Sequence, residues 1–300
     1  MLNLAYKEKL ILGTASFKSS YGLDTNSRLK KKELNEIFKY CLNEKIIYLD
    51  SANDYKLKNF SNYSSNLNVF KIIFKINFNT KKEKVYNQLE KEIFSLVKKF
   101  LSKNKIQKLY CVMLHSEDTM TSENKIKIYK VLSSLKKKKL TEKIGLSGYN
   151  LINIIKIIKK FNFDILQFPY NLFDQRINNK KILKTLKERN IELHIRSIFL
   201  QGIFFINNSK LPTYFDRWKK LFIKIEEILK KKNLNILSLC LSHAFKLNYN
   251  NKKIIFGIKS LQQLHEIKNT KLYNDLRFVK KFKNNEKKLI IPFLWKIKKK

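Results

Sequence analysis

The sequence predicts an α/β fold, a (β/α)8 TIM barrel built as a single domain. Short apolar runs alternate with longer segments of helical period along the chain, and this alternation favours parallel strands joined by crossover helices. Eight such units in 300 residues match a closed barrel better than an open doubly wound sheet. Polar residues follow almost every apolar run at one end only, and barrel enzymes place their chemistry at the carboxyl ends of the strands.

The predicted strands are short, rich in β-branched or aromatic residues and followed by polar loops, which is typical of strands buried on both faces. They are Lys9–Ala15, Lys45–Ala52, Phe70–Ile76, Lys108–His115, Lys143–Tyr149, Ile165–Tyr170, Ile191–Phe199 and Lys253–Ile258. The predicted helices are Lys30–Asn43, Lys81–Lys103, Ser122–Lys139, Leu151–Lys160, Lys180–Arg189, Phe215–Lys232 with Ile236–Leu247, and Leu261–Lys268. The crossover Lys56–Val69 is rich in Asn and Ser and weak in helical period, so we expect a shortened or irregular helix there.

The composition indicates one large core. A 44% hydrophobic share over 300 residues can bury such a core, and no Pro/Gly/Ser-rich linker divides the chain. We therefore expect one barrel domain over residues 1–300, with a solvated basic tail at about residues 296–300.

The cysteines and the N-terminus favour a cytoplasmic protein. Cys41, Cys111 and Cys240 lie far apart in apolar stretches and form no CxxC pair, which is typical of reduced core residues. The N-terminal apolar run is too short for a signal peptide, and no apolar stretch is long enough to span a bilayer. We therefore expect a cytoplasmic location and no membrane partner.

The charge is strongly basic, with 64 Lys and Arg against 24 Asp and Glu and a net charge of +40. Such a charge raises nucleic acid or an anionic membrane as a partner. The lysines, however, are spread over almost every predicted helix, and the chain is equally loaded with Asn and Ile, as an AT-rich coding bias would produce. This pattern favours compositional drift over a binding surface, so we expect no specific nucleic-acid partner.

Four polar residues at or just beyond predicted strand ends suit carbonyl chemistry: Asp50, Tyr55, Lys75 and His115. Since a barrel brings strand ends together, these side chains could polarise a carbonyl and hand it a proton. Taken singly, a strand-end Asp or Lys is more often a solvated turn residue, and a lone Tyr more often packs. The argument therefore depends on the set.

These residues lie within motifs that have a familiar order: LILGTASF…YG, LDSANDY, FKIIFKI, LYCVMLH, KIGLSGYN, ILQFPYNLFDQR, IRSIFLQG and IIFGIKSLQQLHE. The chain resembles the aldo/keto reductase family across nearly its whole length, and ILQFPYNLFDQR and IRSIFLQG resemble a bacterial branch of it. The resemblance implies a barrel that binds an extended nicotinamide cofactor without a Rossmann fold and reduces small aldehydes or ketones, sugars among them. No GxGxxG follows the first predicted strand, so the usual dinucleotide fingerprint is missing.

The resemblance implies a role for each of the four residues. Tyr55 would be the general acid that protonates the carbonyl oxygen. Lys75 would lower the pKa of the Tyr55 phenol, and Asp50 would pair with Lys75 and fix its position. His115 would orient the carbonyl and support the developing oxyanion.

Cofactor positions follow from the same resemblance. Ser147 and Gln167 would hold the nicotinamide carboxamide, with Asn171 as a further polar neighbour. Arg196 stands where the family commonly stacks an aromatic ring on the nicotinamide. The pyrophosphate would meet Ser197, Leu200 and Gly202, and the adenosine end would meet Gly257, Lys259, Ser260, Gln263 and Glu266. Charge-assisted contacts from Lys259 and Ser260 to a 2′-phosphate favour NADP(H), whereas Gln263, where many members carry arginine, leaves NAD(H) open.

The segment after Tyr55 departs from the family pattern, which continues with Gly and then a Ser-Glu pair that opens a helix. Here KLKNFSNYSSNLN follows, and a distorted loop would displace the phenol from Lys75. Two alternatives therefore stay open: a catalytically weak, cofactor-binding sensor or regulatory relative and, on charge alone, a basic nucleic-acid-binding protein. Neither the substrate's identity nor the oligomeric state follows from the sequence.

The remaining polar residues support no further site. The other histidines, His194, His243 and His265, lack metal-ligand spacing, so we expect no metal. Asp174 and Arg176 could pair near the pocket or cap the next helix. Trp295 could reach the mouth of the substrate pocket or pack on the barrel.

Overall fold

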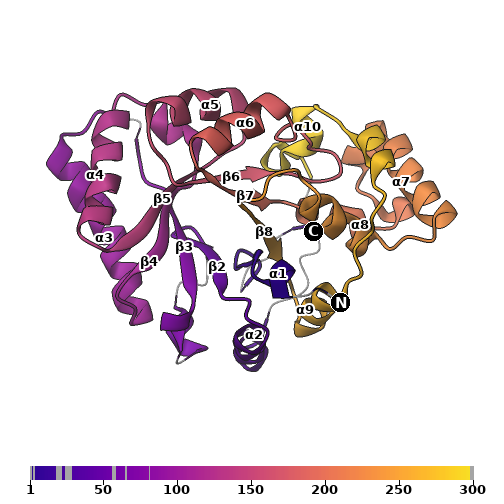
Figure 1. Ribbon diagram of the computed structural model, residues 1–300, viewed down its shortest axis with the longest axis horizontal. Coiled ribbons are helices and arrows are strands. Elements are labelled where there is room, and N and C mark those ends of the chain that lie inside the picture. The colour runs from indigo at the N-terminus through magenta and orange to yellow at the C-terminus, as the bar shows by residue number, and fades with distance from the viewer. Residues whose placement is uncertain are drawn as a thin grey trace.

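The computed structural model describes residues 2, 4–17, 22–23, 29–55, 59–64, 66–80 and 82–297. Over these residues, parallel strands close into a barrel in which each strand pairs with the next one along the chain and the last pairs with the first. The strands are β1 (Leu10–Gly13), β2 (Tyr48–Ala52), β3 (Lys71–Ile76), β4 (Leu109–Leu114), β5 (Thr141–Ser147), β6 (Ile165–Pro169), β7 (Glu192–Arg196) and β8 (Lys252–Gly257). The predicted (β/α)8 barrel is confirmed (Figure 1).

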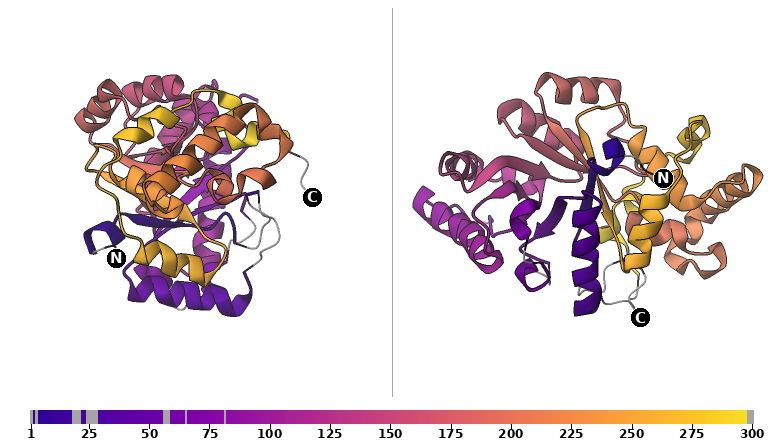
Figure 2. Two further views of the ribbon diagram at one scale, coloured as in Figure 1. Left: turned by 90° about the vertical axis from the view of Figure 1, so that its right-hand side faces the viewer. Right: turned by 60° about the horizontal axis from the view of Figure 1, so that its bottom comes forward.

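Helices cover the outside of the barrel (Figures 1 and 2). Their bounds are α1 (Leu4–Lys7), α2 (Lys31–Asn43), α3 (Tyr86–Asn104), α4 (Lys125–Lys137), α5 (Leu151–Lys160), α6 (Lys180–Glu188), α7 (Lys219–Lys231), α8 (Ile236–Phe245), α9 (Leu261–Asn269) and α10 (Lys287–Ile290). Asparagine begins several of them: the side chains of Asn150, Asn179 and Asn235 accept backbone N–H groups in the first turns of α5, α6 and α8. No helix of the described ranges is long and apolar enough to cross a membrane.

The seventh strand is shorter than predicted. It ends at Arg196 rather than at Phe199, because Ser197 adopts a left-handed backbone with φ of 57°. A residue in that conformation cannot continue a strand. The apolar residues that follow Ser197 therefore belong to a loop over the barrel's carboxyl end, where the sequence alone had extended the sheet.

Two helix starts also differ from the prediction. The helix expected from Phe215 becomes α-helical only at Lys219, and Thr213–Trp218 forms a 3-10 helix instead. Trp218 separates the two with a backbone of φ −110° and ψ 9°, which is far from α-helical values. The helix before the fourth strand, expected from Lys81, begins at Tyr86; Lys81 itself lies outside the described residues.

The strand register brings the candidate catalytic residues to one end of the barrel. Ala52, two residues after Asp50 on β2, is level with Lys75 on β3. Ser147 on β5 is level with Gln167 on β6. Because alternate side chains of a strand lie on the same face, Asp50, Lys75, Ser147 and Gln167 share the interior at the carboxyl ends of their strands.

The crossover between β2 and β3 is irregular, as predicted. In its described part it forms two 3-10 turns, Phe60–Asn62 and Leu67–Val69, and no α-helix. Residues 56–58 and 65 of this crossover lie outside the described residues. The covering that a helix would give to this side of the barrel must therefore come from single side chains.

Phe60 supplies much of that covering. It is fully buried and packs against Phe38 of α2 and Phe100 of α3 at ring-centroid distances of 5.8 and 6.0 Å. Its backbone N–H donates to Asn104 Oδ1 at 2.6 Å. The aromatic ring and the asparagine thus join the crossover to both neighbouring helices.

A second apolar cluster lies outside the barrel's own core. It is formed by the loops after β6 and β7, by α7 and α8, and by the C-terminal segment. Figure 1 shows α7, α8 and α10 gathered at the end of the molecule opposite α3 and α4. This cluster, here called the satellite cluster, links the loop after β7 to the C-terminal segment.

Replacing Phe60 with alanine should lower the free energy of unfolding by about 3–5 kcal/mol, because the buried ring packs between α2 and α3 and its loss leaves a cavity. Urea unfolding followed by circular dichroism measures the change. Val69 of the same crossover is 52% exposed, so Val69→Ala should change stability by less than about 0.5 kcal/mol. Equal and small effects in the two variants would contradict the covering role of Phe60.

Candidate active site

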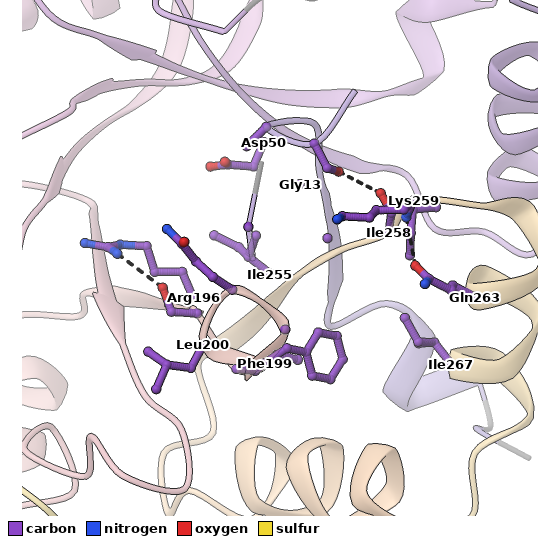
Figure 3. Close-up of a pocket in the computed structure, with 18 of the residues that line it drawn as sticks. Gly13, Asp50, Arg196, Phe199, Leu200, Ile255, Ile258, Lys259, Gln263 and Ile267 are labelled. Atoms are coloured by element: carbon purple, nitrogen blue, oxygen red, sulfur yellow. Dashed lines mark hydrogen bonds between the residues drawn. The ribbon is translucent and has the colours of Figure 1, made fainter. Parts of the chain in front are cut away.

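A pocket of about 760 Å³ opens at the carboxyl end of the barrel. Asp50, Tyr55, Lys75 and His115 line it together. Figure 3 shows Arg196 on one side of this pocket, with Lys259 and Gln263 on the other. The fold therefore unites residues that are separated by more than half of the chain, as the sequence predicted for a barrel.

Lys75 is the centre of the hydrogen bonding in the pocket. Its Nζ donates to Asp50 Oδ1 at 2.6 Å and to the Tyr55 hydroxyl oxygen at 2.9 Å. Gln167 Nε2 donates to the second oxygen of Asp50 at 2.8 Å. Since the Tyr55 oxygen accepts from Lys75, the phenol's own hydrogen stays available to a ligand in the pocket.

The Tyr55 phenol keeps its proton at neutral pH. Burial raises the pKa of Tyr55, and the Lys75 ammonium lowers it, as the sequence predicted, but the net direction is upward from the ordinary value. The influence of Lys75 on the Tyr55 pKa therefore has the predicted direction, but burial outweighs it. For Lys75, burial lowers the pKa, yet Asp50 and Tyr55 together raise it above the ordinary value, so the ammonium is charged.

His115 is uncharged beside this group. Burial and the neighbouring Lys75 lower the pKa of His115 to about 4, although Asp54 and Asp50 oppose the change. Its Nδ1 lies 3.4 Å from an oxygen of Asp54, and its ring meets the Tyr55 ring edge-on at 6.1 Å. A neutral imidazole can offer one N–H or one lone pair to a bound carbonyl compound.

Two of the three residues expected at the nicotinamide line the pocket, and they contact each other. Ser147 and Gln167 both line the pocket, and their side chains lie 3.4 Å apart, from Ser147 Oγ to Gln167 Oε1. Asn171 does not line the pocket; its Oδ1 accepts the N–H groups of Phe173 and Asp174 and holds a turn. Asn171 therefore orders the loop behind the site.

The loop after β7 lines the pocket with strained backbone. Ser197, Leu200 and Gly202 border the pocket and have positive φ values of 57°, 45° and 86°. Positive φ is costly for leucine and serine, and such strain is concentrated at functional sites. The neighbouring Gln201 accepts the Leu23 N–H at 3.3 Å, so this loop meets the loop after β1.

Four of the five residues expected at the adenosine end of the cofactor line the pocket, and the fifth caps a helix. Gly257, Lys259, Gln263 and Glu266 line the pocket, and Gln263 Oε1 accepts the Lys259 N–H at 2.8 Å. Ser260 does not line it; its Oγ caps α9 by accepting the Gln263 N–H at 3.2 Å. The amino end of α9 therefore borders the pocket, and helix amino ends favour phosphate groups.

An aromatic rim was missed by the sequence analysis. Tyr149, Phe199, Phe205 and Phe293 line the mouth of the pocket, and Phe293 is 69% exposed. All of them lie in loops or in the C-terminal segment, where an apolar residue is ordinarily assigned to packing. The signal in the sequence was limited to Tyr149 and Phe199, which are the last residues of two predicted strands.

The other residues singled out from the sequence are structural. Trp295 packs edge-on against Phe215 at 4.9 Å, so it belongs to the satellite cluster. Asp174 and Arg176 form a two-point ion pair, with bonds of 2.8 and 2.7 Å. His194 pairs with Glu192, His243 stacks on Tyr170, and His265 stacks on Tyr40. Among the described residues, no group of three or more His, Cys, Asp or Glu could hold a metal ion.

Titration of His115 by NMR should give a pKa of about 4, and Asp54→Asn should lower it further because the Asp54 carboxylate favours the charged ring. The folded pKa lies below the unfolded value of about 6.5. The neutral ring therefore contributes stability that is fully present above about pH 6.5 and is lost as the pH falls from there towards 4. A His115 titration midpoint near the unfolded value would contradict the influence of burial and of the neighbouring Lys75 on this ring.

The sequence matches the model of the Aldo/keto reductase family over residues 9–280. Similar solved structures include AKR11C1 from Bacillus halodurans in a holo form (15% identity, TM-score 0.68, 91% of each chain covered). Another is AKR2E5 from the silkworm Bombyx mori (13% identity, TM-score 0.67, 97% of this chain and 89% of that chain covered). No curated protein matches at a significant level. Because the family model spans most of its length, this chain belongs to the aldo/keto reductase family.

Proposed function

We propose that this protein reduces the carbonyl group of a small aldehyde or ketone with NADPH and that Tyr55 is the general acid. Aldo/keto reductases are oxidoreductases of carbonyl compounds, and the chain belongs to that family. The observation that carries the proposal is the position of Lys75 Nζ, which donates to both Asp50 and the Tyr55 hydroxyl oxygen inside the pocket.

The pocket suits an extended nicotinamide cofactor. At about 760 Å³ it exceeds what a small carbonyl compound alone needs. Polar side chains lie at one end, and Lys259 with the capped amino end of α9 lies at the other, which suits phosphate groups. Ser147 and Gln167 would hold the carboxamide, and the loop from Ser197 to Gly202 would border the pyrophosphate.

The chain's own residues then divide the chemistry. When bound, the cofactor supplies the hydride that reduces the carbonyl carbon. Tyr55 gives its proton to the carbonyl oxygen, and Lys75 stabilises the phenolate that remains. His115, being neutral, orients the carbonyl by a single hydrogen bond. Asp50 keeps Lys75 charged and in place through its 2.6 Å bond.

The sensor alternative assumes that Tyr55 is displaced from Lys75. The 2.9 Å hydrogen bond from Lys75 Nζ to the Tyr55 hydroxyl oxygen argues against such a displacement. A panel of aldehydes, ketones and oxidised sugars assayed with NADPH distinguishes the two functions. Turnover of any member supports the reductase. Tight NADPH binding with no turnover across the panel would replace it with the sensor.

Tyr55→Phe should lower kcat by roughly 10²–10⁴, because the variant keeps the ring but loses the transferable proton. NADPH affinity should stay nearly constant, since the hydroxyl is assigned to the substrate carbonyl. Tyr129→Phe is the matched control: its hydroxyl bonds Asn162 on the outside of the barrel, and kcat should not change. Full turnover by the Tyr55 variant would reject the role of the phenol.

Lys259→Ala should weaken NADPH by an amount corresponding to about 1.5–3 kcal/mol, the usual worth of a charge-assisted hydrogen bond, and leave NADH nearly unchanged. Fluorescence titration measures both affinities. Lys184→Ala, on the exposed face of α6 with 78% of the side chain accessible, controls for the loss of one positive charge. Equal weakening of NADPH and NADH would remove the assignment of Lys259 to a 2′-phosphate.

A further inference from the structure

The loop after β5, residues 148–150, is held by side chains from the segments that follow β4 and β6. Glu117 Oε1 accepts the N–H groups of Tyr149 and Asn150 at 3.1 and 2.5 Å. Arg176 donates to the Tyr149 carbonyl oxygen at 2.9 Å. Any side chain at Gly148 would collide with Glu117, because a Cβ there would lie 2.3 Å from Oε2. The backbone that carries Tyr149 is therefore fixed on several sides.

The Arg196 guanidinium lies over the ring of this fixed tyrosine. Its guanidinium carbon is 4.0 Å from the centroid of the Tyr149 ring, and Nη2 donates to the Gly148 carbonyl oxygen at 3.0 Å. Nη1 lies 3.4 Å from Ser197 Oγ. Both Arg196 and Tyr149 line the pocket. The planar cation is thus held by stacking and by hydrogen bonds at the edge of the site.

We propose that Arg196, stacked on Tyr149, makes the site bind the reduced nicotinamide cofactor more tightly than the oxidised one. The inference rests on the proposed function, under which position 196 faces the nicotinamide ring. Guanidinium stacks on planar rings as an aromatic side chain does, but it stays charged at all physiological pH values. The oxidised nicotinamide ring is a cation and the reduced ring is neutral, so only the oxidised ring is repelled.

The electrostatics of the neighbouring groups support this assignment. The charge of Arg196 lowers the pKa of both Tyr55 and His115, although burial is the largest influence on each. The field of the guanidinium therefore reaches the catalytic end of the pocket. The other cation at this end, Lys75, forms a 2.6 Å ion pair with Asp50, whose negative charge opposes that of Lys75 at both Tyr55 and His115.

The two redox states of the cofactor provide a direct test, because they differ in the charge of one ring and share every other contact. Isothermal titration of the full chain with NADPH and with NADP+ gives the ratio of the two dissociation constants. We expect NADPH to bind at least about tenfold more tightly, as a nearby like charge in a partly buried site would produce. Arg196→Tyr keeps a stacking ring without the charge and should bring the ratio to within about threefold of unity.

Three matched variants separate this charge effect from general damage. Tyr149→Phe preserves the stacked ring and should leave the ratio unchanged, whereas Tyr149→Ala frees the guanidinium and should lower the ratio. Lys259→Gln, at the opposite end of the pocket, should weaken both redox states equally. Thermal unfolding followed by circular dichroism confirms that each variant is folded.

The outcomes distinguish the inference from the proposed function. Equal affinity for NADPH and NADP+ in the unmodified protein, or an unchanged ratio in Arg196→Tyr, would overturn the inference while leaving the reductase intact. Binding of neither form would overturn the proposed function, and the inference with it. We expect a large ratio in the unmodified protein. It should fall only when Arg196 loses its charge or when Tyr149 loses the ring that holds Arg196.

Discussion

The buried ammonium of Lys75 is the constraint on which the rest of the site depends. The residue is only 3% exposed, and a buried charge that loses its partner costs about 3–5 kcal/mol. Asp50 provides the counter-charge, and both oxygens of Asp50 are used, one by Lys75 and one by Gln167. Lys75 also donates to the Tyr55 hydroxyl oxygen at 2.9 Å and lies 3.5 Å from Gln167 Oε1. Strands β2, β3 and β6 must therefore keep their register for the charge to stay paired, so the geometry of the proposed catalytic group and the closure of the barrel stabilise each other.

The satellite cluster holds the segments that form the mouth of the pocket. Tyr214 donates to the Lys288 carbonyl oxygen at 2.9 Å, and Trp218 Nε1 donates to Glu286 at 3.1 Å. These bonds tie the insertion after β7 to the C-terminal segment, which presents Phe293 edge-on to Tyr149 at 5.1 Å. The barrel thus positions Asp50, Tyr55 and Lys75, whereas the satellite cluster positions the aromatic rim. Under the proposed function, loops outside the barrel can change substrate selectivity without disturbing the buried charge.

How far the sequence could predict this structure depended on the range of the interactions. The eight strands and the polar residues at their ends follow from local patterns, and the closed barrel brought Asp50, Tyr55, Lys75 and His115 into one pocket. The predicted end of β7 was wrong because no local sequence pattern indicates a positive φ at Ser197. The net rise in the Tyr55 pKa could not be predicted either, because it comes from burial in a pocket that only the folded chain forms. The rim was missed for the same reason, since aromatic residues in loops acquire their neighbours only in three dimensions.

The protonation state of Tyr55 and the charge of Arg196 act in the same direction. A phenol whose pKa is raised by burial holds its proton at neutral pH, and a held proton serves an acid that donates to a carbonyl oxygen rather than a base that removes one from an alcohol. We infer that the Arg196 guanidinium, whose carbon is 4.0 Å from the centroid of the Tyr149 ring, disfavours a second cation beside it and so weakens the binding of the oxidised cofactor. Under the proposed function, Tyr55 has a proton to donate during carbonyl reduction. Arg196 lowers the affinity for the oxidised cofactor that the reaction leaves in the site. Both follow from burial and charge at fixed positions of the barrel rim, and both favour carbonyl reduction over alcohol oxidation.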